Sequence, residues 1–291
     1  MSGGLRAFQI YYDAKTRAAL DPEFEPLDNS ANERRDWYEY WPMRKYLLEQ
    51  PLDEAARYGF LSPRFYEKTH ITGGRVKEFV RGCGDADVIT FSPHPCFAAC
   101  FVNVFEQADF FYRGLYPASV RFFGRIDPSV RLDRLVTDSR NTVFCNYFFA
   151  KPAFWRAWMG ILERMFEETE SATSPLHELL GWEIPYQNDD GITRPAGSKI
   201  FVMERAVSFL LAASPGYTVR NFPPFEFPVM RPFAGRIGEL MALDELKIAY
   251  SATGDPHYLE TFIRNRDRTI ESVWPEAPPR LFSKGAWGEA A

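Results

Sequence analysis

Two cations follow directly on an apolar, strand-like run, and their position suggests anion binding. The stretch RYGFLSPRFYEKT (57–69) carries Tyr-Gly-Phe-Leu, stops at Ser62-Pro63 and continues with Arg64 and Lys68. Ligands of α/β proteins bind beyond the carboxyl ends of the strands. An arginine fork can hold two phosphate oxygens at once, whereas a lysine offers a compact positive charge. Ser62, Arg64 and Lys68 are therefore candidates for binding a phosphorylated ligand, with a plain surface salt bridge as the alternative for the arginine.

A polar loop near the first strand offers a second set of binding groups. The segment LDNSANERRD (27–36) contains Asn29, Ser30 and Arg34, and it leads into a predicted helix. The amino end of a helix favours negative charge, so such a loop can hold a uridine, a ribose or a phosphate. Tyr11, at the end of the first strand, belongs to the same predicted site. A solvated loop that caps the helix is the alternative.

An acidic pair raises the question of a metal. Asp85 and Asp87 form a DxD in GDADVITF, and such a pair can hold Mg²⁺ or Mn²⁺ bridging a nucleotide diphosphate. The pair precedes its predicted strand, whereas this chemistry requires it to follow one, and a solvated turn is the alternative. Asp189 and Asp190 lie in a polar loop with the same alternative. No metal site is therefore predicted, and Asp85 and Asp87 are the candidates should one exist.

Several common catalytic patterns are absent from the sequence. It contains no GxGxxG after the first strand, no GxxxxGK[ST] and no GxSxG, which argues against a Rossmann dehydrogenase, a P-loop enzyme and a nucleophile-elbow hydrolase. The four cysteines include no CxxC pair, and the four histidines form no zinc motif. We expect the cysteines to be buried free thiols.

Length and composition indicate an ordinary globular protein. The chain has 291 residues, 46% hydrophobic and 25% charged residues, and a net charge of −5. A general nucleic-acid binder would usually be basic, so this class is discounted. No apolar run approaches the roughly 18 residues of a membrane span, and the N-terminus shows no signal-peptide core. A cytoplasmic location is expected, and peripheral contact with a membrane is compatible with the sequence.

Alternating strands and helices predict the fold class. Strands are expected near 5–12, 57–62, 87–92 and 141–150, and the longest helix is expected to start at Pro152, where apolar residues recur with a period of 3.6. Other helices are expected from Asp36 to Pro51, over 73–82, twice within 96–123, in the later part of 198–212, and near 235–250 and 255–271. The segments 171–197 and 221–233 are predicted to be loop-rich and extended. This order predicts an α/β fold with a mostly parallel sheet.

Three segments together resemble a family of bacterial glycosyltransferases of cell-surface and capsular polysaccharide synthesis. They are EYWPMRKYLLEQPLDEAARYGFLSPRFYEKT (39–69), NTVFCNYFFAKPAFWRAWMGILERMFE (141–167) and SKIFVMERAVSFLL (198–211), in the family's order. The first is similar to a helix, a short link and a strand Tyr-hydrophobic-Gly-hydrophobic that runs into His-Tyr-Arg-Arg. Gly59 and Arg64 match this pattern, whereas Ser62-Pro63 stand where the family has His-Tyr and Phe65 replaces the second arginine. The other segments are similar to an Asn-aromatic strand followed by a Trp-containing helix, and to a later block in which Glu204-Arg205 match and Met203 replaces a serine.

The resemblance implies a GT-A-like fold and a glycosyl transfer reaction. One domain over 1–291 would consist of a nucleotide-sugar-binding half (1–135) and an acceptor-side half with C-terminal helices (136–291). The donor would be a nucleotide sugar, in the first place a UDP-sugar, and the acceptor a glycan. The diphosphate leaves as an anion, so the reaction needs cations or a metal, and inversion needs a base on the acceptor hydroxyl.

The resemblance then assigns roles to individual residues. Arg64, Lys68 or Arg205 would supply the positive charge, Asp138 and Glu204 are rival candidates for the base, and Asn141 and Asn146 would lie on the acceptor side. Two other hypotheses remain open. One is a non-catalytic relative of the same fold that binds a glycan or acts as a scaffold, and the other is an unrelated α/β hydrolase or phosphatase.

Overall fold

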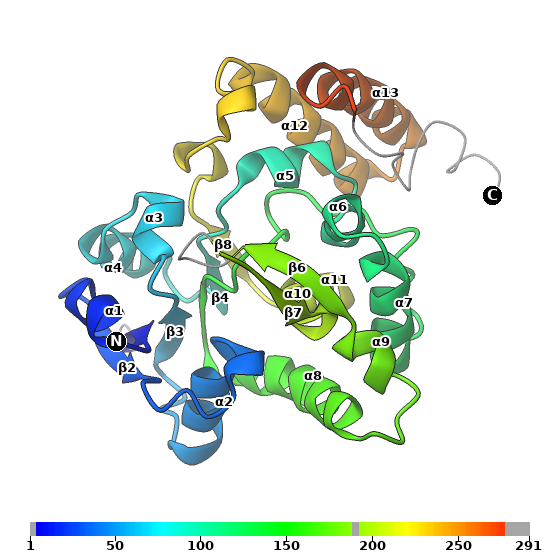
Figure 1. The fold of residues 1–291 in the computed structure, drawn as a ribbon. Helices are drawn as coiled ribbons and strands as arrows, with labels where there is room; N and C mark the ends of the chain where they lie inside the picture. Colours follow the sequence, from blue (N-terminus) through cyan, green and yellow to red (C-terminus); the bar gives the residue numbers. More distant parts are fainter. Residues whose placement is uncertain (1–3, 188–191, 277–291) are drawn as a thin grey trace.

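A computed structural model describes residues 4–187 and 192–276. Its centre is a mixed sheet in which all strands run parallel except β5, which is antiparallel to both of its neighbours (Figure 1). In spatial order the strands are β2 (Glu25–Asp28), β1 (Leu5–Tyr11), β3 (Arg57–Leu61), β5 (Phe148–Ala150), β4 (Val88–Thr90) and β8 (Val219–Asn221). The predicted α/β class with a mostly parallel sheet flanked by helices is therefore confirmed.

Helices cover both faces of the sheet, and a two-stranded hairpin lies apart from it. The hairpin consists of β6 (Glu183–Gln187) and β7 (Thr193–Gly197). The α-helices are α1 (Ala14–Ala18), α2 (Tyr40–Glu49), α3 (Phe65–Thr69), α4 (Gly73–Gly82), α5 (Pro95–Cys100), α6 (Val104–Phe111), α7 (Leu115–Ile126), α8 (Pro152–Glu170), α9 (His177–Gly181), α10 (Ser198–Glu204), α11 (Ala206–Ala213), α12 (Ile237–Thr253) and α13 (Pro256–Val273). Short 3-10 helices occupy Arg35–Trp37, Pro224–Glu226 and Arg231–Phe233.

Alternate side chains of the strands enter two different cores. Phe8 and Phe60 pack with residues of α2, α7, α8 and α11 in one buried cluster. Ala7, Leu61 and Phe149 belong to a second cluster, with residues of α3 and α4. This assignment follows from the pleat, which sends successive side chains to opposite faces of a sheet.

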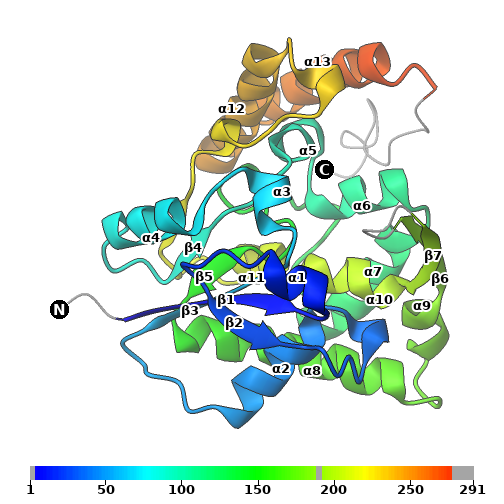
Figure 2. The same cartoon turned by 60° about the vertical axis from the view of Figure 1, so that its left-hand side comes forward.

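The helices α12 and α13 form a separate pair above the sheet (Figure 2). Their apolar residues pack on α5 and on Phe110 in a third buried cluster. In the described part of the chain, none of the helices combines the length and apolar character needed to span a membrane.

Gly59 is required by a close approach across the sheet. It pairs with Phe149 of β5, and a Cβ atom at this position would lie 2.2 Å from the Phe149 ring. That separation is far inside van der Waals contact, so a larger residue in β3 would force β5 away. The glycine thus fixes β5 beside β3.

Several predicted elements are confirmed nearly residue for residue. The strands β1 and β3 and the helices α4, α8, α12 and α13 form where the sequence predicts them. Local signals explain this agreement. The Thr72 side chain caps α4 by accepting the Arg75 N–H, and Pro152 occupies the first turn of α8.

Other predictions are wrong at identifiable positions. Only 148–150 of the expected strand 141–150 forms, because Cys145 and Asn146 adopt left-handed φ angles of 61° and 53°. The helix expected at Asp36 begins at Tyr40, since the Asp36 carboxylate binds Arg34 and Lys199 instead of capping a helix. The span 96–123 contains parts of three helices rather than two, the region 171–197 forms α9 and the hairpin, and β2 and β8 were not predicted.

Candidate functional site

The carboxyl edge of the parallel strands brings together residues that lie far apart in the sequence. In the orientation of Figure 2, β1 points towards the β6–β7 hairpin, so this edge faces the hairpin and α10. Helix α3 follows β3 at the same edge, and the segment 144–147 leads into the reversed strand β5 there. We call the cluster formed by Lys68, His94, Cys145, Asn146 and Glu204 the edge cluster.

Lys68 is the central cation of the edge cluster. It lies on α3, and its half-buried side chain carries the ammonium 5.9 Å above the Tyr147 ring. The Nζ atom donates to the Sγ atom of Cys145 over 3.4 Å. Sulfur is a weak acceptor, whereas an ammonium has three donors. Among the residues that the structure describes, Lys68 has no carboxylate within ion-pair distance, so its hydrogen-bonding capacity is largely unused.

The loop before β5 is held in an unusual conformation. Cys145 and Asn146 are consecutive non-glycine residues in the left-handed region, which costs conformational energy that the surroundings must offset. Glu204 Oε1 accepts the Cys145 N–H over 2.7 Å, and the Ser92 hydroxyl accepts the Phe144 N–H over 3.0 Å. The loop is thus fastened from both α10 and the segment after β4.

An unsatisfied polar atom lies within this loop. The Oδ1 atom of Asn146 is buried and has no hydrogen-bond partner among the described residues, and only 8% of the residue is exposed. The adjacent Tyr147 hydroxyl is paired with the Ser62 hydroxyl at 2.5 Å. A buried acceptor without a donor costs about 1–3 kcal/mol, so its persistence calls for an explanation such as a bound group that donates.

Electrostatics fix the charge states of the edge cluster. Burial alone would lower the pKa of Lys68, but Cys145, Tyr147, Glu204 and Glu39 together raise it above its ordinary value. Burial raises the pKa of Glu204, yet Arg205, Lys68 and the Cys145 N–H hold it below its ordinary value. At neutral pH the site therefore presents an ammonium beside a carboxylate.

His94 and Cys145 stay neutral in the same surroundings. Burial, reinforced by the charge of Lys68, lowers the pKa of His94 to about 4. Burial raises the pKa of the Cys145 thiol to about 11, against the opposing effect of Lys68. The thiol is thus a poor nucleophile here, and the positive charge of the cluster is concentrated on Lys68.

Glu39 and Tyr186 complete the surroundings of Lys68, although neither is a sequence-predicted site residue. Glu39 precedes α2 and raises the pKa of Lys68. Burial raises the pKa of Tyr186 in β6, Glu39 and Glu204 raise it further, and Lys68 opposes them. Glu39 lies within the helix that the sequence predicts from Asp36 to Pro51. The carboxyl end of β4 pointed to the region of His94, but no local signal identifies Tyr186, since its hairpin was not predicted.

No protein-family model, curated protein sequence or solved structure matches the chain. The geometry of the edge cluster therefore carries the functional argument by itself.

The predicted arginines at this edge have carboxylate partners. Arg64 forms two hydrogen bonds of 2.6 and 3.0 Å with Glu67 in the next turn, which places its charge on the rim. Arg205 is 4% exposed and donates to Glu204, Gln107 and the Phe201 carbonyl. Arg205 therefore holds Glu204 in place, and its role in donor binding stays a prediction. Ser62 is 7% exposed and is engaged by Tyr147, so it too supports the loop.

The predicted loop 27–36 lies at the outer end of the same edge. The Asn29 N–H donates to the Tyr11 carbonyl over 2.8 Å, and Ser30 N–H donates to Asp28 Oδ1. Hydrogen bonding to Asp28 raises the pKa of the Tyr11 hydroxyl. These residues remain candidates for the far end of a ligand that extends along the strand ends.

Arg34 departs from its predicted role. Its guanidinium pairs with Asp36 at 2.9 Å and with Glu170 at 2.6 Å, and it lies over the rings of Trp41 and Phe166. Two carboxylates neutralise its charge, so the residue ties the loop to the end of α8, and phosphate binding by Arg34 stays a prediction.

Asp138 and Asn141 form a closed turn. The Asp138 carboxylate is fully buried and accepts two hydrogen bonds from the Arg140 guanidinium, at 2.9 and 2.7 Å. Asn141 Oδ1 accepts the Asp138 N–H. A base must reach its proton, and the buried, paired carboxylate of Asp138 is poorly placed for that. Its role as the base stays a prediction, with Glu204 as the rival carboxylate.

The DxD pair lies at the opposite edge of the sheet. Asp87 binds Thr218 and Lys151, and Asp85 pairs with Lys151 at 3.0 Å with its side chain 95% exposed. Within the ranges that the structure covers, three or more His, Cys, Asp or Glu side chains nowhere gather in an arrangement suited to a metal ion. Asp189 and Asp190 lie outside the described residues.

Proposed function

We propose that the chain is a cytoplasmic glycosyltransferase with a GT-A-like fold, in which the edge cluster binds a nucleotide sugar. The donor is a UDP-sugar and the acceptor is a glycan of surface or capsular polysaccharide synthesis. The α/β architecture is compatible with this fold assignment. The single observation that carries the proposal is the state of Lys68, a half-buried ammonium at the carboxyl edge of the sheet whose hydrogen-bond acceptor is a thiol.

The chemistry of the leaving group explains why such a lysine fits. A nucleotide diphosphate departs as an anion, and a preorganised cation in a partly dry site stabilises that charge without solvent reorganisation. A phosphate oxygen is a far better acceptor than the sulfur of Cys145. The unsatisfied Oδ1 atom of Asn146 would accept a hydroxyl of the donor, and Tyr11, Asn29 and Ser30 extend the edge towards the nucleoside.

Thermal unfolding with and without ligand tests the proposal. Millimolar UDP or UDP-sugar should raise the melting temperature, since a ligand at 100 times its Kd adds about 2.7 kcal/mol of stability. Lys68→Met should abolish the shift. Lys151→Met is the matched control, because Lys151 lies at the opposite sheet edge and is paired with Asp85 and Asp87. No shift with any nucleotide or nucleotide sugar contradicts the proposal.

The non-catalytic alternative is favoured by one observation on Glu204. Both of its oxygens accept hydrogen bonds, Oε1 from the Cys145 N–H and Oε2 from Arg205, and its pKa lies below the ordinary value, which makes it a weak base. A protein that binds the donor without transferring sugar would show the UDP shift without donor hydrolysis. Hydrolysis of a UDP-sugar that Glu204→Gln removes, while the UDP shift persists, would exclude this alternative.

A further inference from the structure

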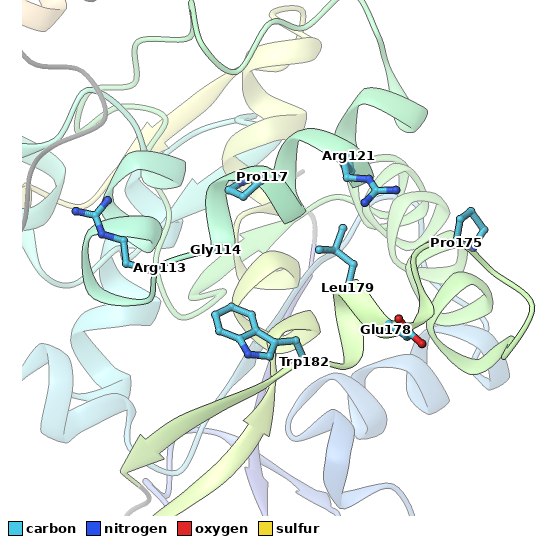
Figure 3. A pocket seen from close by; sticks show the side chains of 8 residues that line it. All are labelled: Arg113, Gly114, Pro117, Arg121, Pro175, Glu178, Leu179 and Trp182. Atoms are coloured by element: carbon cyan, nitrogen blue, oxygen red, sulfur yellow. The ribbon is translucent and has the colours of Figure 1, made fainter.

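A second site candidate is an open hollow of about 440 Å³ where the α6–α7 junction meets α9 (Figure 3). Figure 3 shows Trp182 on one side, Pro117 and Arg121 on the α7 side, and Leu179 between them. The complete lining is Arg113, Gly114, Pro117, Arg121, Pro175, Glu178, Leu179 and Trp182. The edge cluster contributes none of these residues, so the hollow is a separate feature of the surface.

Trp182 provides a fixed aromatic platform in the hollow. The residue is 42% exposed, although a large apolar side chain is usually more deeply buried. Its six-membered ring lies against Gly114, where an added Cβ atom would be 3.1 Å from Cζ3. Gly114 also has a φ of 103°, which a side chain would strain. The absence of a side chain at Gly114 thus allows the indole of Trp182 to pack directly on the backbone, while part of the indole remains exposed to solvent.

The charges of the hollow favour an anion. Arg121 is exposed, and in the described part of the chain no ion pair holds it, whereas Arg113 pairs with Asp109. Glu178 supplies one exposed carboxylate. Because Asp109 pairs with Arg113, Arg121 is the guanidinium of the lining that is placed to bind an anion. A second hollow, at the end of α8, has the opposite character.

The lining of that second hollow is Arg164, Glu167, Glu168, Ser171, Thr173 and Ser174. Acids outnumber its single arginine, and it offers no aromatic ring. It therefore serves as a control hollow in the same chain, which we do not expect to bind an acidic saccharide.

We propose that the Trp182 hollow binds a saccharide that carries a carboxylate. The weakly polar face of a sugar ring packs on the indole, Arg121 binds the carboxylate, and Glu178 accepts a sugar hydroxyl. The assignment of this hollow as an acceptor subsite, with an acidic glycan as the acceptor class, rests on the proposed function. The binding itself does not, because it needs neither Lys68 nor a nucleotide.

Saturation-transfer NMR with two probes tests the proposal on the full chain. The acidic probe is a tetrasaccharide of alternating glucuronic acid and N-acetylglucosamine, and the neutral probe is cellotetraose. The acidic tetrasaccharide should bind, and Trp182→Ala should weaken its binding about tenfold, as expected for loss of an aromatic anchor. Arg121→Gln should weaken the acidic probe and leave the neutral one unchanged, and Arg164→Gln in the second hollow should change neither.

Each other outcome has a defined meaning. Absence of acidic-probe binding, or binding that Trp182→Ala leaves unchanged, overturns the proposal. Equal binding of both probes with no effect of Arg121→Gln overturns the assignment of an acidic ligand. The UDP-induced thermal shift is measured on the same variants and should persist in Trp182→Ala. If the wild-type chain binds the acidic tetrasaccharide but shows no UDP-induced shift, the proposed donor site is refuted and the proposed saccharide site in the hollow stands.

Discussion

Two regions of the molecule hold a lysine away from bulk solvent, one fully buried and one half-buried, and they satisfy it in opposite ways. Lys247 of α12 is fully buried and donates to the carbonyl oxygens of Ala98, Phe101 and Thr137, so each of its three donors has an acceptor. Lys68 in the edge cluster has the same three donors and binds one thiol sulfur. Lys247 thus joins α12 to α5 and to the segments at Phe101 and Thr137. Most of the hydrogen-bonding capacity of Lys68 is left unused by the described residues.

The polar groups around the two lysines repeat this contrast. Near Lys247, Glu106 is 1% exposed, and its carboxylate accepts the Val102 N–H and two hydrogen bonds from Arg266, which is itself fully buried. In the edge cluster, no group within 4–187 or 192–276 forms a hydrogen bond with the Oδ1 atom of Asn146. We call the group of Glu106, Lys247 and Arg266 the anchor cluster.

The difference separates structural polar groups from candidates for binding. A fully satisfied buried network rigidifies a fold, whereas an unsatisfied one is unfavourable unless a ligand completes it. Burial of charge alone does not distinguish the two clusters, since both hold ions that are at least partly buried. The two clusters differ in how far the hydrogen bonds of their lysine are satisfied, and this contrast yields predictions for each side.

The largest expected effect belongs to the anchor cluster. Arg266→Met leaves the Glu106 carboxylate buried without its cation, and such a broken pair costs about 3–5 kcal/mol of unfolding free energy. Urea unfolding measures the loss. Arg236→Met is the control, because Arg236 forms a partly exposed pair with Glu239 and should cost less than about 1 kcal/mol. Similar losses in the two variants would contradict the anchoring role.

The pH dependence of stability tests the edge cluster. His94 has a folded-state pKa of about 4 against an ordinary value of 6.5, so between these values the unfolded chain binds the additional proton. Stability should therefore fall as the pH drops from 6.5 towards 4, by up to about 3 kcal/mol from this group. His94→Asn, which tolerates the left-handed φ, should remove that part of the slope, with the exposed His257→Asn as control. An unchanged slope in His94→Asn would show that the imidazole is not held neutral by its surroundings.

A pair of asparagines gives the next smaller contrast. Asn103 is 2% exposed, caps α6 through Oδ1 and donates to the carbonyls of Leu132 and Leu135, so Asn103→Gly should cost about 2 kcal/mol or more. Asn146→Gly should cost less than about 1 kcal/mol, because it removes an unsatisfied oxygen and glycine accepts the left-handed φ of 53°. Thermal unfolding of both variants measures the difference. A loss in Asn146→Gly that equals the loss in Asn103→Gly would mean that Asn146 is a structural residue.

Much of the fold follows from local sequence signals. The 3.6-residue period after Pro152 and the apolar run before Ser62 correctly predict α8 and β3. The predicted strand 141–150 is longer than β5. Its β-branched and aromatic residues favour a strand, but Glu204, 59 residues away, accepts the Cys145 N–H and holds this backbone in a turn. Tertiary contacts overrode local propensity there.

The candidate site was predictable in part for the same reason. Lys68 follows β3, so its place at the carboxyl edge follows from the alternation of strands and helices. Asn146 lies at the same edge because β5 is antiparallel, and Glu204 because α10 packs on the loop before β5, and neither arrangement was predicted. Whether a cation is available to a ligand or is neutralised by carboxylates depends on partners that are distant in the sequence. Asp36 and Glu170 neutralise Arg34, whereas no carboxylate pairs with Lys68 in the described part of the chain, and no local pattern distinguishes the two.

The most direct test compares Lys68→Met with Lys247→Met in urea unfolding, each with and without saturating UDP. Lys247→Met should lose about 3 kcal/mol of unfolding free energy, because three buried carbonyls lose their donor, and it should keep the stabilisation by UDP. Lys68→Met should lose less than about 1 kcal/mol and should lose the UDP stabilisation altogether. A loss of stability in Lys68→Met as large as that in Lys247→Met, or full UDP stabilisation in Lys68→Met, would contradict the proposal that the edge cluster binds an anion.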